Sequence, residues 1–489
     1  MIKRLITILL CFFMIFSISI DAYAFEETNQ KESQAIYYIL IDRFHNGTGK
    51  NDYETDVKNM NAFFGGDFIG ISEKLDYIKE MGFSIINLSP IFNNDQNGYD
   101  GHSVIDFESV EEHYGTLDEF RSLVKEAHKK GLKVIVDLDF FYTSKNHPWL
   151  KDLSKQDWYL ETNEEKAKLN INNPYVQQYF IEIASKWMKE TGIDGFRFVH
   201  LHQIPTTYLS NFIEEIRQVN TNAIFTGEIM DSKDLEQYKE FGLTFIGDIS
   251  FMENLRESFS AFDHSLKEIN EFIQNSLHQQ ELIKMFDHEQ SSRFTFDMVN
   301  HNMNPGTRWK LALTYLFTTP GYPFVMYGSE IALNGDLPPN NHQFMNFRTE
   351  KELIDLLKKL KELRNQYPSL TYGDFDVLYD DQHAAIYKRV YNDETMIVAI
   401  NNGSKTLHVE IDEDKIAKGQ ELKGVLNGDL IREANHKYSF FIDREQSEIY
   451  LLKEKSGINI SFLIAIIAVN VIFITFMYIV WKRGKKKAE

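Results

Sequence analysis

Gly195-Phe-Arg-Phe-Val-His-Leu-His-Gln-Ile204 is the stretch from which the fold can be worked out. Its apolar residues, together with the preceding Ile193-Asp194, indicate a short buried strand that ends in a polar cluster. Arg197 lies between two phenylalanines in this strand. A buried guanidinium is costly unless a carboxylate or another acceptor meets it. We therefore expect the end of this strand to face a polar site that the rest of the chain builds.

Similar apolar segments recur along the chain and alternate with amphipathic helical segments. Including the first stretch, the predicted strands are 35–41, 83–88, 132–136, 193–198, 223–226, 244–249, 294–299 and 323–327. The helices predicted between them include 71–81, 117–130, 174–190, 208–219 and 235–241. Eight such units indicate an α/β fold, a closed (β/α)8 TIM barrel, over residues 25–365. The site of such a barrel lies at the C-terminal strand ends, where Asp137, Arg197, Glu228 and His301 fall.

The pattern changes after Leu370 to short alternating segments that are separated by turn residues. This change predicts a C-terminal antiparallel β-sandwich over residues 366–453.

Both ends of the chain carry apolar segments. Residues 1–24 have a basic start, an apolar run and a small-residue cleavage motif, which together predict a signal peptide. Residues 458–481 form a run of 24 uncharged residues, and the basic tail 482–489 follows directly. This order predicts a single transmembrane helix with a cytoplasmic tail and an extracellular domain anchored to the cell membrane.

Composition narrows the class of protein. The formal net charge of −20 argues against nucleic-acid binding, which needs basic surface stripes. The single cysteine, Cys11, lies inside the predicted signal peptide, so the mature chain is expected to contain no disulfide.

Several motifs resemble the alpha-amylase family of retaining glycoside hydrolases, glycoside hydrolase family 13. They are Phe63–Gly70, Leu88–Phe92, Gly98–Asp100, His113–Thr116, Lys133–Asp137, Gly192–Arg197, Thr226–Glu228, Asn300–His301 and Thr319–Glu330. Their order and spacing are similar to the family's from about residue 35 to residue 450. The resemblance implies a catalytic barrel, a small insert after the third strand at about 142–171, and a C-terminal sandwich.

The resemblance also implies roles for individual residues. The acid/base position falls on Glu228, the nucleophile position on Val199 and the third-carboxylate position on Asn302. The Asn-His pair that usually ends the third-strand motif falls on Phe141 and Tyr142. The sugar-binding positions fall on Tyr99, Asp100, Asp137, Arg197 and His301.

A retaining mechanism needs a nucleophile, and Val199 has no lone pair with which to form a glycosyl ester. Strand alternation places His200 and His202 on the face opposite Val199, so neither is expected to replace the nucleophile. Asp139 shares a face with Asp137. It would either place a carboxylate in the pocket or, as we expect, pair with Arg197 or a lysine.

Oxygen donors cluster in turns near the first strand, and such donors suit calcium. The cluster resembles the calcium loop of cyclodextrin-acting family members, in which Asn46, Thr48, Asn51, Asp52, Gly65 and Asp67 would be the ligands. An ordinary Asx turn at Asn46-Gly47 explains these residues equally well. No organic cofactor is expected.

Three functions remain open at this point. The first is a membrane-tethered protein that binds an α-glucan or maltooligosaccharide and has lost, or nearly lost, glycosidase activity, a pseudoenzyme. The second is an active hydrolase or transglycosylase with an altered mechanism that uses Asp139 or an activated water. The third is a structural partner of a membrane protein whose identity the sequence does not reveal.

Overall fold

The computed structural model describes residues 34–163, 166–230, 232–276, 280–381, 383–455 and 460–485. The predicted signal peptide, residues 1–24, lies outside these described residues.

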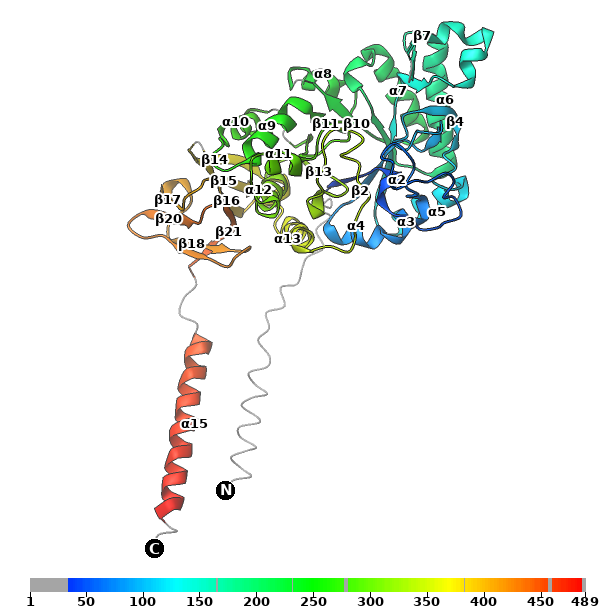
Figure 1. Cartoon of the computed structure of the whole chain (residues 1–489). Helices are drawn as coiled ribbons and strands as arrows, with labels where there is room; N and C mark the ends of the chain where they lie inside the picture. Colours follow the sequence, from blue (N-terminus) through cyan, green and yellow to red (C-terminus); the bar gives the residue numbers. More distant parts are fainter. Residues whose placement is uncertain are drawn as a thin grey trace. The chain divides into compact units, whose positions relative to one another are not determined.

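Eight parallel strands close into a barrel, which confirms the predicted TIM-barrel fold (Figure 1). Around the barrel the order is β1-β13-β12-β11-β10-β9-β5-β2. The barrel strands are β1 (Ile36–Ile39), β2 (Ile85–Leu88), β5 (Lys133–Leu138), β9 (Gly195–Phe198), β10 (Ile224–Ile229), β11 (Phe245–Asp248), β12 (Leu282–Lys284) and β13 (Tyr322–Met326). Each strand is almost wholly buried, because side chains fill the barrel on one side and helices cover it on the other.

Helices connect the strands, and local sequence fixes their ends. Thr116 and Glu119 form a capping box at the start of α5, and Gly192 ends α6 in the left-handed region with a φ of 77°. The helices of the barrel region are α2 (Ile41–Phe44), α3 (Phe68–Glu73), α4 (Leu75–Met81), α5 (Leu117–Lys129), α6 (Pro174–Thr191), α7 (Thr206–Val219), α8 (Leu235–Glu240), α9 (Ile249–Ser260), α10 (Lys267–Asn275), α11 (Phe294–Asn300), α12 (Pro305–Thr318), α13 (Glu352–Gln366) and α14 (Ser369–Tyr372).

The seventh strand is not where the sequence pattern placed it. Residues 294–299 belong to helix α11, and the barrel strand is β12, which is only three residues long. The hydrophobic pattern does not predict this strand, because the charged residue Lys284 interrupts its apolar run. The ammonium of Lys284 is fully buried and donates to the carbonyl oxygens of Leu316 (2.7 Å) and Thr319 (3.0 Å).

Two small sheets lie in the loops that follow β2 and β5. A hairpin pairs β3 (Phe92–Asn94) with β4 (Val104–Val110). The second sheet has the order β6-β8-β7, with β6 (Tyr142–Ser144), β7 (Tyr159–Thr162) and β8 (Lys166–Leu169). These three strands fall within the insert predicted at about 142–171.

The C-terminal domain consists of two antiparallel sheets, as the alternating pattern predicted. One has the order β14-β15-β16-β21-β18-β19 and the other pairs β17 with β20. The strands are β14 (Asp374–Asp381), β15 (Ala384–Tyr391), β16 (Glu394–Asn401), β17 (Leu407–Asp412), β18 (Gln420–Gly424), β19 (Leu430–Arg432), β20 (Lys437–Ile442) and β21 (Gln446–Glu454). Apolar side chains of both sheets, such as Ile397 and Phe440, meet in one cluster.

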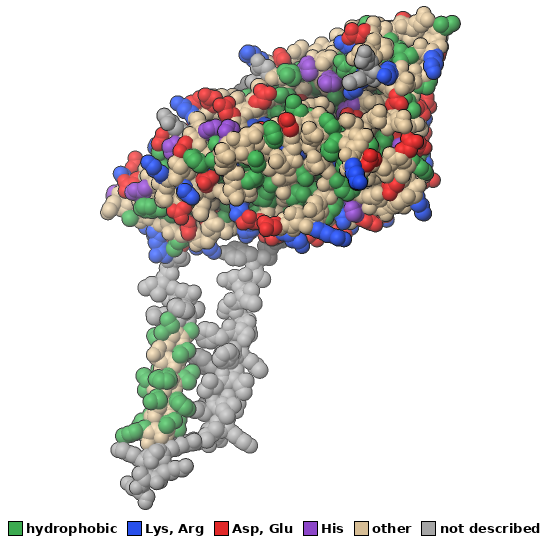
Figure 2. Space-filling model, viewed as in Figure 1, with side chains coloured by type: hydrophobic (Ala, Val, Ile, Leu, Met, Phe, Trp, Pro, Cys, Tyr) green, Lys and Arg blue, Asp and Glu red, His purple; other side chains and the backbone are tan. Residues whose placement is uncertain are grey.

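A single helix, α15 (Ile460–Lys485), follows this domain. Its segment Ile464–Lys482 has a mean hydropathy of 2.5 and buries none of its surface against the protein. Hydrophobic side chains cover this helix in Figure 2, whereas acidic and basic side chains are interspersed over the viewed face of the domains. The helix is long and apolar enough to span a bilayer.

Candidate active site

The Arg197 guanidinium lies at the centre of the predicted site and is 1% exposed. Its three nitrogens each meet a different carboxylate. Nη1 lies 2.8 Å from Asp137 Oδ2, Nε 2.9 Å from Glu228 Oε1, and Nη2 2.8 Å from Glu289 Oε1. The buried charge that the sequence showed therefore has acceptors on every side, as burial of a guanidinium requires.

The parallel register of the strands brings these side chains together. Arg197 on β9 pairs in register with Asp137 on β5 and with Thr226 on β10. Glu228 follows Thr226 by two residues, so both side chains point to the same face of β10. Asn87 on β2 donates to the other oxygen of Asp137 at 2.7 Å and holds that carboxylate in place.

Glu289 was not among the predicted site residues. It follows β12 in the segment Phe286-Asp-His-Glu289, and its Oε2 is buried without a hydrogen-bond partner. The residues predicted in its place are elsewhere: His301 ends helix α11 and Asn302 follows it, and both are exposed. The prediction placed them in the site because it took α11 for a strand. An acidic residue directly after a histidine at a strand end was the available signal.

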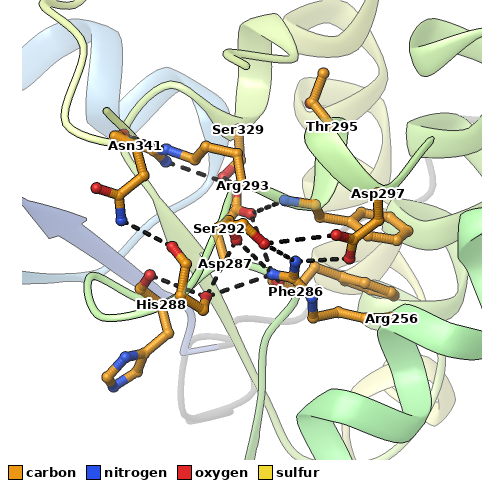
Figure 3. A network of polar contacts seen from close by, with 12 residues as sticks. Arg256, Phe286, Asp287, His288, Ser292, Arg293, Thr295, Asp297, Ser329 and Asn341 are labelled. Atoms are coloured by element: carbon orange, nitrogen blue, oxygen red, sulfur yellow. Dashed lines mark hydrogen bonds and ion pairs between the residues drawn. The ribbon is translucent and has the colours of Figure 1, made fainter. Parts of the chain in front are cut away.

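A network of buried ion pairs fixes the loop that carries Glu289 (Figure 3). Asp287 accepts from the Phe294 backbone N–H and the Ser329 hydroxyl, each at 2.6 Å. Its Oδ2 also lies 3.6 Å from Arg293 Nη1. The Asn341 amide donates to the Glu289 carbonyl at 2.8 Å. These contacts orient the loop before any ligand arrives.

Three carboxylates share one guanidinium, and the pKa values of two of them, Asp137 and Glu289, shift in opposite directions. Burial raises the pKa of Asp137 to about 7, with the charges of Glu289 and Glu228 adding to burial and Arg197 opposing it. Burial also acts to raise the pKa of Glu289, but Arg197 and His288 outweigh it and lower that pKa to about 2. The cluster therefore keeps a proton on Asp137 more readily than on Glu289.

Val199 lies in the wall of a cavity of about 290 Å³ that Arg197, Glu228 and Glu289 also line. Its backbone N–H donates to the Leu138 carbonyl at 3.1 Å, which continues the β9–β5 pairing beyond the end of the strand. The position that the resemblance assigns to a nucleophile thus faces the cavity, and it carries two methyl groups.

The two histidines after Val199 line the same cavity, contrary to the prediction that they point to the opposite face. Strand β9 ends at Phe198, so alternation no longer applies beyond it. His200 adopts a left-handed conformation with φ 56° and ψ 38°, and the 3-10 helix η3 (Leu201–Gln203) follows. This turn brings His200 and His202 back to the cavity wall.

Asp139 is 6% exposed and pairs with neither Arg197 nor a lysine among the described contacts, contrary to expectation. Its Oδ1 accepts from the Phe141 backbone N–H at 2.7 Å, and its Oδ2 lies 3.9 Å from His102 Nδ1. It does not line the cavity beside Val199.

The predicted sugar-binding residues divide between two cavities. Arg197 lines the first cavity, whereas Tyr99 and Asp100 line a larger polar cavity of about 790 Å³, together with Asp95 and Lys166. The Tyr99 ring is 6% exposed, because the Arg43 guanidinium lies 3.9 Å from its centre and its hydroxyl lies 3.0 Å from His342 Nδ1. Asp137 is fully buried beneath Arg197.

Comparisons with known proteins agree with this geometry. The family described as "Alpha amylase, catalytic domain" matches residues 38–165 and 149–346, and "Alpha-amylase C-terminal domain" matches residues 373–450. The chain belongs to the alpha-amylase family. The match covers the barrel strands β2 to β13 in full and most of the C-terminal domain.

Solved alpha-amylases have the same fold. An Anoxybacillus alpha-amylase is 42% identical, with a TM-score of 0.84 over 87% of this chain and 99% of that one. An alpha-amylase from Geobacillus thermoleovorans, solved with acarbose, is 38% identical, with a TM-score of 0.82 over 87% and 100%. A cyclomaltodextrinase of Thermoanaerobacter pseudethanolicus is 28% identical over 79% of this chain and 74% of its own length.

The loop that resembles an alpha-amylase-family calcium loop joins its predicted residues in two groups, Asn46 with Asp52 and Gly65, and Thr48 with Asp67. Asn46 Nδ2 donates to Asp52 Oδ1 at 2.9 Å, and Asp67 Oδ2 accepts from the backbone N–H groups of Gly47 (3.0 Å) and Thr48 (2.9 Å). A Cβ atom on Gly65 would lie 2.6 Å from Asp52 Oδ1. The Asn51 side-chain oxygen is buried and has no hydrogen-bond partner.

Proposed function

We propose that the barrel binds an α-glucan or maltooligosaccharide, and that retaining hydrolysis is lost or strongly reduced. One observation carries the proposal. Val199 faces the cavity at the nucleophile position, while Arg197 and the carboxylates around it keep a closed network. A valine cannot form the glycosyl ester that a retaining mechanism requires.

We infer that the site keeps one more carboxylate than the sequence suggested. Glu289 contacts Arg197, and we infer that it serves as the third carboxylate in place of Asn302. On this inference the nucleophile is the catalytic carboxylate that the described residues of this site lack. Glu228 remains as the acid/base. Glu289 Oε2 has no hydrogen-bond partner, lies 3.4 Å from His288 Nε2, and is suited to accept a hydrogen bond from a sugar hydroxyl. A pocket of this kind keeps affinity for sugar after it has lost the attacking group.

Binding of maltotetraose to the whole chain in detergent tests the proposal by calorimetry. We expect binding by the wild type and, for Glu289→Gln, an affinity lower by roughly tenfold, because a charge-assisted hydrogen bond becomes a neutral one. Glu410→Gln, on the surface of the C-terminal domain, is the matched control and should bind like the wild type. A chain that binds no maltooligosaccharide would remove the proposal. Rapid wild-type hydrolysis that retains the anomeric configuration, and that Glu228→Gln abolishes, would contradict its second half.

We also propose that α15 spans the cell membrane and that the barrel and the C-terminal domain are extracellular. The support is the apolar length of Ile464–Lys482 together with the basic residues that follow it. The chain leaves β21 at Glu454, and α15 begins at Ile460, so the C-terminal domain would lie close to the membrane surface.

A calcium ion at the loop of residues 46–67 is the third part of the proposal. The unpaired oxygen of Asn51, the carboxylate of Asp52 and the close approach of Gly65 to Asp52 support an oxygen-ligated cation. The Asp67 carboxylate already accepts from the backbone N–H groups of Gly47, Thr48 and Gly70, so it would bind the ion while keeping these bonds. Asn46 would turn its amide so that its oxygen faces the ion. Thr48 holds Asp67 through its backbone N–H. The ion would stabilise this loop beside the barrel mouth.

A further inference from the structure

His200 occupies an unusual backbone conformation in the cavity wall next to Val199. Its φ of 56° lies in the left-handed region, which is uncommon for residues other than glycine, although asparagine, aspartate and histidine adopt it more often than the rest. Such conformations cost of the order of 1 kcal/mol and persist where the surroundings impose them, often at functional sites. The result here is that the imidazole lines the cavity that Glu228 also lines.

Two aromatic rings hold this imidazole in place. The ring of Phe141 lies edge-on to it with centroids 6.3 Å apart, and the ring of Tyr142 does so at 5.9 Å. These are the two positions where the family pattern has an Asn-His pair, and Val199 is the neighbouring position in sequence. Phe141 and Tyr142, which contact His200, and Val199, which precedes it, therefore all differ from the family pattern.

We propose that His200 is a general base that activates a water molecule for direct attack on the anomeric carbon, an inference that rests on the proposed sugar binding. The water oxygen forms a bond to this carbon as the glycosidic C–O bond breaks. The water gives a proton to a nitrogen of His200, and Glu228 gives its proton to the departing glycosidic oxygen. Exchange with solvent then returns both groups to their starting states. The configuration at the anomeric carbon is inverted.

His200 and Glu228 line the same cavity, as an acid and a base that act on one bond must. Inverting enzymes hold acid and base about 6.5–9.5 Å apart to leave room for water, whereas retaining enzymes hold them about 5–5.5 Å apart. His200 follows the nucleophile position by one residue, beyond the end of β9. The side chain of Val199 is one atom shorter than that of an aspartate, so it leaves space in the cavity for the attacking water.

Other bases line the cavity less suitably. His202 and Glu253 are exposed to solvent, and His288 and Glu289 both contact the Arg197 guanidinium. His200 is half-buried between its aromatic neighbours. A base fixed by packing keeps its geometry without reorganisation during the reaction. His200 is therefore the group that the geometry favours.

Hydrolysis of α-maltosyl fluoride, followed by proton NMR, tests the attack step by itself, because fluoride departs with little help from an acid. The protein is the whole chain in detergent, at a concentration where turnover outruns mutarotation. We expect the wild type to release β-maltose first. His200→Asn should be slower by about 100-fold or more, since general-base catalysis contributes that much. Asparagine tolerates the left-handed backbone, so this variant should fold.

His408→Asn, an exposed histidine in β17, should keep the wild-type rate. Val199→Asp combined with His200→Asn should release α-maltose, because a carboxylate nucleophile then replaces the base. The inference falls if the wild type releases α-maltose, shows no turnover above buffer, or is unaffected by His200→Asn. Maltotetraose binding without turnover would overturn this inference alone, whereas the absence of binding would overturn the proposed function as well.

Discussion

In the proposed function a single side chain, Val199, determines how this alpha-amylase-family barrel can act. The neighbouring strands hold Asp137 and Glu228 each within 2.9 Å of the Arg197 guanidinium, so the site has not collapsed. A valine in this wall removes a nucleophile without leaving an unpaired polar group. Under the proposed function, the valine therefore leaves the folded site stable but prevents formation of a glycosyl ester.

The shifted pKa values of Asp137 and Glu289 make the free energy of unfolding depend on pH. The folded-state pKa of Asp137, about 7, lies above its unfolded value, so the stability it contributes is present at low pH and is lost as pH rises from about 4 to 7. Glu289, with a pKa of about 2, acts in the opposite sense, and its contribution is lost as pH falls below about 4.5.

We predict that the free energy of unfolding of the wild type, relative to Asp137→Asn, falls by up to about 4 kcal/mol between pH 4.5 and pH 7.5. Asparagine does not titrate, so the variant isolates this carboxyl group. Thermal unfolding of both proteins at several pH values measures the difference. Asp118→Asn, an exposed aspartate in α5, should differ from the wild type by a constant amount. Parallel pH profiles for wild type and Asp137→Asn would rule out the raised pKa.

At the scale of elements, the sequence predicted most of the barrel because its strands are short, apolar and separated by capped helices. Seven of the eight strands were placed within a few residues, and the C-terminal sheets were recognised by their alternation. The seventh strand was missed because Lys284 interrupts a three-residue strand, and a buried lysine cannot be told from a surface one by periodicity.

The same error displaced part of the site. With the seventh strand misplaced, His301 and Asn302 took the positions that belong to His288 and Glu289. The sequence also failed to predict that His200 lines the cavity, for a different reason. Alternation holds only inside a strand, and the left-handed turn after Phe198 could not be read from a sequence without glycine there.

The loop between α2 and α3 is the element whose stability calcium should control. We predict that EDTA lowers the thermal midpoint of the wild type and that added calcium, but not magnesium, restores it. An ion present at 100 times its dissociation constant stabilises by about 2.7 kcal/mol. Asp52→Asn should unfold at the same temperature with and without EDTA. The nearby exposed Asp56→Asn should respond to EDTA as the wild type does. An unchanged wild-type midpoint in EDTA would exclude the site.

At the scale of the whole molecule, the barrel and the C-terminal domain share buried polar contacts. Arg308 on α12 donates to the Asn402 side chain and to the Ala261 carbonyl, and the Thr318 and Tyr387 hydroxyls lie 2.6 Å apart. Such contacts tie the two domains together, so the C-terminal domain is part of the scaffold on which the site depends.

The apolar helix should determine where the whole molecule is found. We predict that the full chain sediments with membranes and requires detergent for release. A chain ending at Lys455 should be recovered in the soluble fraction with its maltotetraose binding intact. Protease added to intact cells should cleave the domains while the tail after α15 stays protected. A soluble full chain, or a protected barrel, would contradict the proposed topology.

The rate of maltotetraose hydrolysis by Val199→Asp, compared with the wild type and with Val199→Asn, tests the central claim most directly. Asparagine has the shape of aspartate without its nucleophilic charge, so it controls for packing. The account predicts that Val199→Asp gains at least about a thousandfold over the wild type, with α-configured product, and that Val199→Asn gains nothing. A wild type that already hydrolyses as fast as Val199→Asp, with retention, would contradict it.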